Sequence, residues 1–252
     1  MIKAIILDWA GTTVDYGCFA PVGAFIKAFA AFDLYPAVEE IRAPMGMQKK
    51  AHIAKMLEGK PHTQEDIDKI YDRFEPALFD VLAKYTDLLP GLPAAIARIR
   101  EMGIAIGSTT GYTRAMMDVV VPLAKEKGYS PDCVVCPDEV GGMGRPAPYM
   151  LWRNLEKLGV TSIHEVLKIG DTVADIDEGK NAGCLCVGVL KGSSMLGLSE
   201  EELSAISRPE AHVLLKAATE VYKTAGADYV IDDITFLPEL VKYLNKEVKR
   251  YV

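Results

Sequence analysis

Short apolar segments alternate with helical patterns along most of this chain, and that alternation restricts the fold more than any other feature. Strand-like apolar runs lie at residues 104–109, 133–137, 166–171, 185–190 and 229–232. Helical patterns separate them at residues 113–127, 146–158 and 172–182, a largely helical stretch follows at 192–225, and a last helix is expected at 237–248. Continuous apolar strands joined by helices predict a parallel sheet that is buried on both faces.

A long helical block near the N-terminus interrupts this alternation. A first strand at residues 2–8 is followed, from residue 17 to residue 88, by helical patterns without strand-like alternation. Pro21 and Pro44 are placed to open two helices, and a longer helix is expected from Thr63 to Tyr85.

The expected fold is therefore α/β. Residues 1–16 and 89–252 form a Rossmann-like parallel-sheet core with helices on both faces, and residues 17–88 form an inserted α-helical cap domain.

Composition excludes several classes of protein. The chain has 252 residues, of which 50% are hydrophobic, and this suits one α/β domain with a small insert. The formal charge of −7 argues against a nucleic-acid-binding face, and there is no apolar run long enough for a membrane span. Five cysteines and a first segment without a signal-peptide pattern favour free thiols and a cytoplasmic location.

Polar residues follow four successive strands, and ligands of open parallel sheets bind at that edge. They are Asp8, then Thr110 with Gly111, then Arg145, and finally Asp171 with Asp175. Carboxylate oxygens suit Mg²⁺, whereas a hydroxyl, backbone N–H groups and an arginine suit a phosphoryl group. A carboxylate could then attack phosphorus to give an acyl-phosphate. Each residue taken singly also has an ordinary explanation as a turn or helix cap.

These strand ends resemble the four ordered motifs of the haloacid-dehalogenase superfamily. The stretches are Asp8-Trp-Ala-Gly-Thr-Thr, Ser108-Thr-Thr-Gly, Gly144-Arg-Pro and Gly170-Asp-Thr-Val-Ala-Asp175. The resemblance implies a magnesium-dependent hydrolase with Asp8 as the nucleophile. It implies Mg²⁺ held by Asp8, the Ala10 carbonyl and Asp171, with Asp175 orienting the metal shell. Thr110, Gly111 and Arg145 are expected to bind the phosphoryl oxygens.

Two of these positions depart from the common pattern of the superfamily. Most of its phosphatases carry a second Asp two residues after the nucleophile, which protonates the leaving oxygen and contributes about 10²–10⁴ in rate. Ala10 stands there, so a phosphomonoesterase or a sugar phosphomutase would lack its acid, whereas an enzyme whose leaving atom is carbon would not need one. Arg145 replaces the usual Lys and adds a planar fork for two phosphoryl oxygens.

A helix expected to begin at Pro44 carries a lysine on an apolar face. At about 100° per residue, that face holds Met45, Lys49, His52, Ile53 and Met56. Lys49 either extends its ammonium into water or is a desolvated amine that can form a Schiff base with a carbonyl group. His52 either relays protons or is a packed core histidine.

Several longer stretches resemble the phosphonoacetaldehyde hydrolase family. They are residues 8–21, the Met-Gly-x-x-Lys-x-x-His run that ends at His52, and residues 107–114, 144–149 and 192–202. The helical insert is shorter after His52 than is usual for that family.

The resemblance implies a route for breaking the carbon–phosphorus bond. Lys49 condenses with the aldehyde of phosphonoacetaldehyde, Asp8 attacks phosphorus, and acetaldehyde and phosphate are released, in 2-aminoethylphosphonate degradation. A homodimer built through the caps is also implied, and Cys18, Met45 and Tyr112 are expected to line the pocket. A catalytically silent relative, which binds phosphate or acts as a scaffold, is a further alternative, although the presence of Asp8, Asp171 and Arg145 counts against it.

Overall fold

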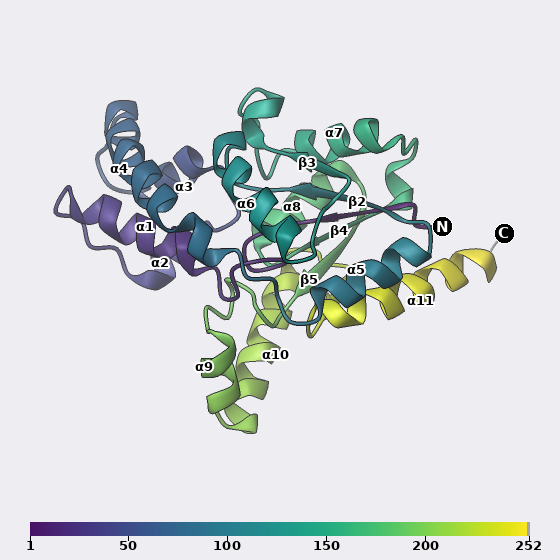
Figure 1. Ribbon diagram of the computed structural model, residues 1–252. Helices are drawn as coiled ribbons and strands as arrows, with labels where there is room; N and C mark the ends of the chain where they lie inside the picture. The colour runs from purple at the N-terminus through teal and green to yellow at the C-terminus, as the bar shows by residue number, and fades with distance from the viewer. Residues whose placement is uncertain (251–252) are drawn as a thin grey trace.

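A six-stranded parallel sheet forms the centre of the molecule, as expected (Figure 1). The computed structural model describes residues 1–250, with side chains described as far as Lys246. The strands are β1 (Ala4–Leu7), β2 (Ala105–Thr109), β3 (Cys133–Val135), β4 (Val166–Gly170), β5 (Leu185–Val189) and β6 (Tyr229–Ile231). Their order is β3-β2-β1-β4-β5-β6, so β1 pairs with β2 on one side and with β4 on the other.

Helices cover both faces of this sheet. One face carries α5 (Leu92–Glu101), α6 (Arg114–Glu126) and α11 (Leu237–Arg250), and the other carries α7 (Tyr149–Leu158), α8 (Val173–Ala182) and α10 (Arg208–Thr224). Ile5 and Leu7 of β1 pack in the first layer, whereas Ala4 and Ile6 pack in the second. Alternate side chains of one strand therefore build two separate cores.

A short helix, α9 (Glu200–Ala205), forms with α10 a pair that extends away from the sheet (Figure 1). Short 3-10 turns lie at Ala83–Tyr85, Pro137–Val140, Ile163–Glu165 and Ile234–Phe236. The five cysteines are free and buried. Within residues 1–250, every helix is too short or too polar to cross a membrane.

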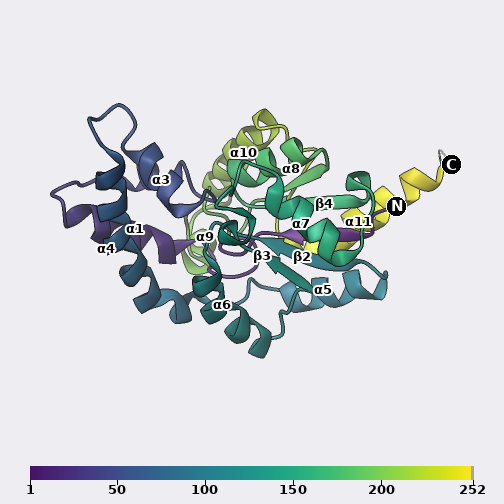
Figure 2. The ribbon, with the colours of Figure 1, turned by 90° about the horizontal axis from the view of Figure 1, so that it is seen from above.

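Four helices between β1 and α5 form a block beside the sheet, visible in both views (Figures 1 and 2). They are α1 (Phe19–Ala30), α2 (Val38–Arg42), α3 (Lys49–Met56) and α4 (Gln64–Leu82). α1 packs along α4, where the rings of Phe25 and Phe74 stack with centroids 4.2 Å apart. The helical character predicted for residues 17–88 is confirmed, and Thr63 caps α4 by accepting a hydrogen bond from the Asp66 N–H.

Two expected helix starts were wrong. Pro44 opens no helix, because Gly46 has a φ of 87° and interrupts the chain before Gln48 caps α3. Met45 therefore lies in a turn and not on the face of α3. The helix expected from Pro146 begins at Tyr149, consistent with the low helical tendency of residues that precede prolines.

Candidate active site

Three carboxylates meet beyond the ends of the neighbouring strands β1 and β4. Ligand oxygens of Asp8, Asp171 and Asp175 all lie within 4.8 Å of one another, and all three residues are buried. The loop after β1 comes so close that a Cβ on Gly11 would lie 2.3 Å from Asp171 Oδ2, which only glycine avoids. A compact set of oxygen ligands suits a hard divalent cation such as Mg²⁺.

The three carboxyl groups of this cluster differ in the direction of their pKa shifts. Burial, together with the two neighbouring carboxylates, raises the pKa of Asp171 well above its ordinary value. Burial also raises the pKa of Asp8, although Arg145 opposes the shift. Asp175 behaves in the opposite way, because Arg145 and Lys168 outweigh its burial and lower its pKa. A divalent cation would relieve the repulsion around Asp8 and Asp171, so the residues present fit one.

Asp171 is held from three directions. The Thr12 hydroxyl donates to Asp171 Oδ1 (3.1 Å), and the Ser194 backbone N–H donates to Oδ2 (2.8 Å). The Tyr222 hydroxyl donates to the Asp171 carbonyl oxygen (2.6 Å). Ser194 and Tyr222 belong to the stretch 192–225, and neither was predicted as a site residue from the sequence.

Arg145 lies beside Asp8, as expected, but its guanidinium is largely engaged by the protein. Its Nη1 is 2.7 Å from Asp8 Oδ1 and 3.0 Å from Asp175 Oδ1. Its Nε and Nη2 donate to Glu178 Oε2 (3.0 Å) and to the Thr109 hydroxyl oxygen (2.7 Å). Of the guanidinium nitrogens, only Nη1 therefore faces the nucleophile. In this arrangement Arg145 does not present two nitrogens to two phosphoryl oxygens, as the sequence had suggested.

A second buried cation, Lys168, lies next to Arg145 and was missed. Its Nζ is 2.8 Å from Asp175 Oδ1 and 3.1 Å from Glu178 Oε2, and it donates to Thr109 Oγ1 (2.9 Å). The signal in the sequence was a lysine within the otherwise apolar strand Val166–Gly170. Lys168 and Glu178 are both completely buried.

Lys49 lies on the opposite side of the nucleophile and opens to a small cavity of about 20 Å³, room for about one water molecule. The cavity wall brings together two groups of expected residues: Asp8, Ala10, Thr110 and Gly111 from the sheet edge, with Cys18, Met45, Lys49 and Tyr112. Lys49 is only 3% exposed, so its ammonium does not extend into water.

Apolar surroundings make the Lys49 amine easier to deprotonate. Burial lowers the pKa of Lys49 to about 8, against an opposing influence of Cys18 and Asp8. Its Nζ lies 5.0 Å from the ring centroid of Tyr112 and 5.9 Å from that of Phe25. The described residues offer this nitrogen no hydrogen bond or ion pair.

His52 lies one turn from Lys49 but outside the cavity wall. Its Nε2 is 2.8 Å from the Ile41 carbonyl oxygen, and its ring packs on Phe25 with centroids 4.1 Å apart. Burial and the nearby Lys49 lower the pKa of His52 well below its ordinary value. The ring is therefore neutral and packed, with Nε2 as the donor and Nδ1 left without a partner among the described residues.

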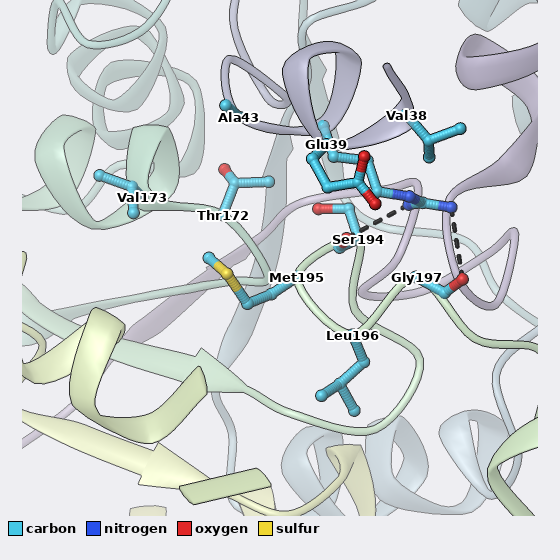
Figure 3. A pocket seen from close by; sticks show the side chains of 10 residues that line it. Val38, Glu39, Ala43, Thr172, Val173, Ser194, Met195, Leu196 and Gly197 are labelled. Atoms are coloured by element: carbon cyan, nitrogen blue, oxygen red, sulfur yellow. Dashed lines mark hydrogen bonds between the residues drawn. The ribbon is translucent and has the colours of Figure 1, made fainter. Parts of the chain in front are cut away.

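A larger cavity of about 360 Å³ adjoins this site between α2 and the loop after β5 (Figure 3). Arg42 spans it, donating through Nη1 to the carbonyl oxygens of Gly17 (2.8 Å) and Ser194 (3.2 Å), and through Nη2 to that of Gly197 (3.5 Å). Its wall includes Thr172, which also borders the smaller cavity, but none of the three clustered carboxylates. It is a contact region between the helical block and the sheet domain.

Comparisons with known proteins agree with this geometry. A family model described as haloacid dehalogenase-like hydrolase matches residues 2–183, and a second, described as HAD-hydrolase-like, matches residues 142–235. A phosphonoacetaldehyde hydrolase from Bacteroides fragilis is 45% identical and aligns over 98% of both chains.

Two further relatives differ in how much of their own length is matched. A bifunctional phosphonoacetaldehyde hydrolase/aminoethylphosphonate transaminase from Clostridioides difficile is 44% identical over 98% of this chain, but the chain spans only 41% of that protein. The crystal structure of a phosphonoacetaldehyde hydrolase-like protein from Oleispira antarctica is 34% identical, with a TM-score of 0.94 over 99% of this chain and 94% of that one. The chain therefore belongs to the haloacid dehalogenase-like hydrolases and, among them, to the phosphonoacetaldehyde hydrolase family.

Proposed function

We propose that this chain hydrolyses the carbon–phosphorus bond of phosphonoacetaldehyde to acetaldehyde and phosphate, in the degradation of 2-aminoethylphosphonate. The observation that carries the proposal is a buried amine, Lys49, which has no polar partner among the described residues and opens to the same small cavity as the Asp8 carboxylate. In phosphonoacetaldehyde a single methylene carbon joins the aldehyde carbon to the phosphorus atom, so one small substrate offers an electrophile to each of these two nucleophiles.

Lys49 provides the first covalent step. With a pKa of about 8, a useful fraction of its amine is neutral near pH 7 and can attack the aldehyde carbon, with loss of water. The protonated imine then accepts the electron pair released when the carbon–phosphorus bond breaks, which leaves an enamine. Protonation of that enamine and hydrolysis of the imine return acetaldehyde and free Lys49.

Asp8 provides the second covalent step, in-line attack on phosphorus to give an aspartyl-phosphate that water later hydrolyses. Arg145 Nη1, the Thr110 hydroxyl and the Gly111 backbone N–H bind the phosphoryl oxygens. We assign a Mg²⁺ site to Asp8, the Ala10 carbonyl and Asp171, with Asp175 as an outer partner. A bound cation there would neutralise charge on the phosphoryl oxygens.

Ala10 fits this reaction better than it fits ester hydrolysis. Ala10 borders the cavity, and it stands at the sequence position where a phosphatase would carry its acid. Because the leaving atom is carbon and its electrons pass to the imine, no acid aimed at an ester oxygen is needed.

The helical block, residues 17–88, acts in this proposal as a cap on the domain formed by residues 1–16 and 89–252. A cavity of about 20 Å³ is too small for a phosphonate, so the block must move to admit substrate. Closure then excludes water and brings Lys49 over Asp8. Arg42 would stabilise the closed arrangement through its contacts with the carbonyl oxygens of Ser194 and Gly197.

His52 and the residues that line the pocket have supporting roles in the proposed reaction. His52 Nδ1, which has no partner in the part of the chain that the structure describes, is the ring atom available for a proton relay near Lys49. Cys18, Met45 and Tyr112 shape the pocket, and burial raises the pKa values of Cys18 and Tyr112 well above their ordinary values. Both side chains therefore stay protonated.

We also propose a homodimer joined through the helical blocks, in the cytoplasm. Apolar side chains are exposed on α1 and in the segment that follows it: Ile26, Phe32, Tyr35 and Val38. Light scattering should give a dimer mass for the wild type and a lower mass for Tyr35→Asp; a wild-type monomer would contradict this part of the proposal.

Product release tests the function itself. The purified protein is incubated with phosphonoacetaldehyde and Mg²⁺, and acetaldehyde and phosphate are followed in parallel. Equal release of both products, lost in Lys49→Arg, supports the proposal. Hydrolysis of p-nitrophenyl phosphate that survives Lys49→Arg, without acetaldehyde release, would instead indicate a phosphomonoesterase.

A further inference from the structure

Lys168 makes three polar contacts beneath the nucleophile. Its Nζ donates to the Thr109 hydroxyl (2.9 Å) and forms ion pairs with Asp175 Oδ1 (2.8 Å) and Glu178 Oε2 (3.1 Å). Burial and Arg145 oppose its protonation, yet Asp175 and Glu178 outweigh them and raise the pKa of Lys168. This cation is fixed in place and permanently charged, and none of its atoms borders the cavity.

Glu178 is the acceptor that joins the two cations. Its Oε2 accepts from Arg145 Nε (3.0 Å) and from the Thr109 hydroxyl (2.8 Å), and it lies 3.1 Å from Lys168 Nζ. The Thr109 hydroxyl in turn accepts from Arg145 Nη2 and from Lys168. Because these bonds occupy Nε and Nη2, they fix the plane of the guanidinium and turn Nη1 toward Asp8.

The formal charge of this buried group is also defined. Its acidic members are Asp8, Asp171, Asp175 and Glu178, and its fixed cations are Arg145 and Lys168. With all four carboxylates ionised, these acids and the two cations leave −2, which is the charge that one divalent cation neutralises. Without Lys168 the group would carry −3, and without Glu178 it would carry −1.

We propose that Lys168 and Glu178 are positioning residues of the phosphoryl site, which aim Arg145 Nη1 and Asp175 and set the charge of the carboxylate group to match one divalent cation. The inference rests on the proposed metal site and adds two residues to it that touch neither substrate nor metal. If both residues had a purely structural role, substituting them would change the stability of the fold but not the affinity for the metal ion. The charge-setting role predicts effects of opposite sign on metal affinity.

Calorimetric titration of Mg²⁺ into metal-free protein at pH 8 separates these possibilities, with thermal unfolding of the same samples as the folding control. Lys168→Met should bind Mg²⁺ about tenfold more tightly than the wild type, and Glu178→Gln about tenfold more weakly. The double variant Lys168→Met/Glu178→Gln restores the charge of −2 and should bind within about threefold of the wild type. Lys168→Arg, which keeps the charge, should also stay near the wild type.

Changes of the same sign in Lys168→Met and Glu178→Gln, or no change in either, would overturn the inference. If Lys168→Met does not fold, the Mg²⁺ affinity of Glu178→Gln still tests the charge-setting role. Glu178→Asp, which keeps the charge, is its control. Absence of Mg²⁺ binding in the wild type would refute the metal site of the proposed function, and with it this inference. Opposite shifts in a protein that does not cleave phosphonoacetaldehyde would leave the inference standing and remove the proposed substrate.

Discussion

Two lysines buried on either side of Asp8 have opposite environments. Lys168 lies beneath the nucleophile among the oxygens of Asp175, Glu178 and Thr109. Lys49 lies above it, next to the rings of Tyr112 and Phe25 and without a hydrogen-bond partner among the described residues. The pKa of Lys168 is raised, whereas burial lowers the pKa of Lys49 to about 8.

The difference shows how one side-chain type serves two purposes. Paired with carboxylates, a buried lysine is a permanent cation that organises other charges. Deprived of such partners, it gives up its proton easily and becomes a nucleophile. The proposed reaction needs both: fixed positive charge near the phosphoryl group and a neutral amine near the carbonyl carbon.

The largest expected effect is a difference in the rate of acetaldehyde release between variants of Lys49 and variants of its neighbour Lys50. Lys49→Met should lower the rate of acetaldehyde release by at least about 10³-fold, because Lys49 supplies the amine in the cavity wall formed by the described residues. Lys50, half-exposed and paired with Asp68 at 2.6 Å, is the matched control, and Lys50→Met should stay within about twofold of the wild type. Equal losses in the two variants would contradict the assignment.

Stability should reveal the network around Lys168. Lys168→Met leaves the buried carboxylates Asp175 and Glu178 with Arg145 as their one remaining cation among the described residues, so the free energy of unfolding should fall by about 3–5 kcal/mol. Denaturant unfolding measures this directly. A loss below about 1 kcal/mol would show that the ion pairs do not hold this side of the site together.

Lys49→Met should change the free energy of unfolding in the opposite direction to Lys168→Met. A lysine whose folded-state pKa is lowered to about 8 destabilises the fold below that pH, and this cost disappears as pH rises toward the unfolded value of 10.5. Lys49→Met should therefore raise the free energy of unfolding by about 3 kcal/mol at pH 7, and by less than half of that at pH 9.5. A destabilised Lys49→Met at pH 7 would argue against a strained amine.

The pH dependence of turnover gives the smallest expected effect. Since only the neutral amine attacks the aldehyde, kcat/KM should rise about tenfold from pH 6 to pH 7 and level off above the Lys49 pKa of about 8. A flat profile over this range would indicate that deprotonation of Lys49 does not limit the reaction.

Much of the architecture was predictable because it depends on local pattern. The strands were found as apolar runs, and Asp8, Asp171 and Asp175 came together because ends of parallel strands share one edge. Lys49 was found from its place among apolar residues on a helix, although that helix begins at Lys49 and not at Pro44.

The features of the site that could not be predicted from the sequence depend on contacts between segments that are far apart along the chain. Tyr222 reaches the Asp171 carbonyl from a helix far along the chain, and nothing local marks it. The engagement of Arg145 by Glu178 and Thr109 likewise appears only when β2, β4 and α8 are packed together. Lys168 was the one residue with a visible signal, a charge within a wholly buried strand.

The central claim is that Lys49 forms the imine, and borohydride trapping tests it most directly. The protein is mixed with phosphonoacetaldehyde and Mg²⁺, quenched with borohydride and analysed by peptide mass spectrometry, alongside Asp8→Asn. We expect a reduced adduct on Lys49 in both proteins, with the phosphonate retained in Asp8→Asn because its carbon–phosphorus bond is not cleaved. An adduct on Lys50 instead, or no adduct while acetaldehyde and phosphate are still released, would contradict the account.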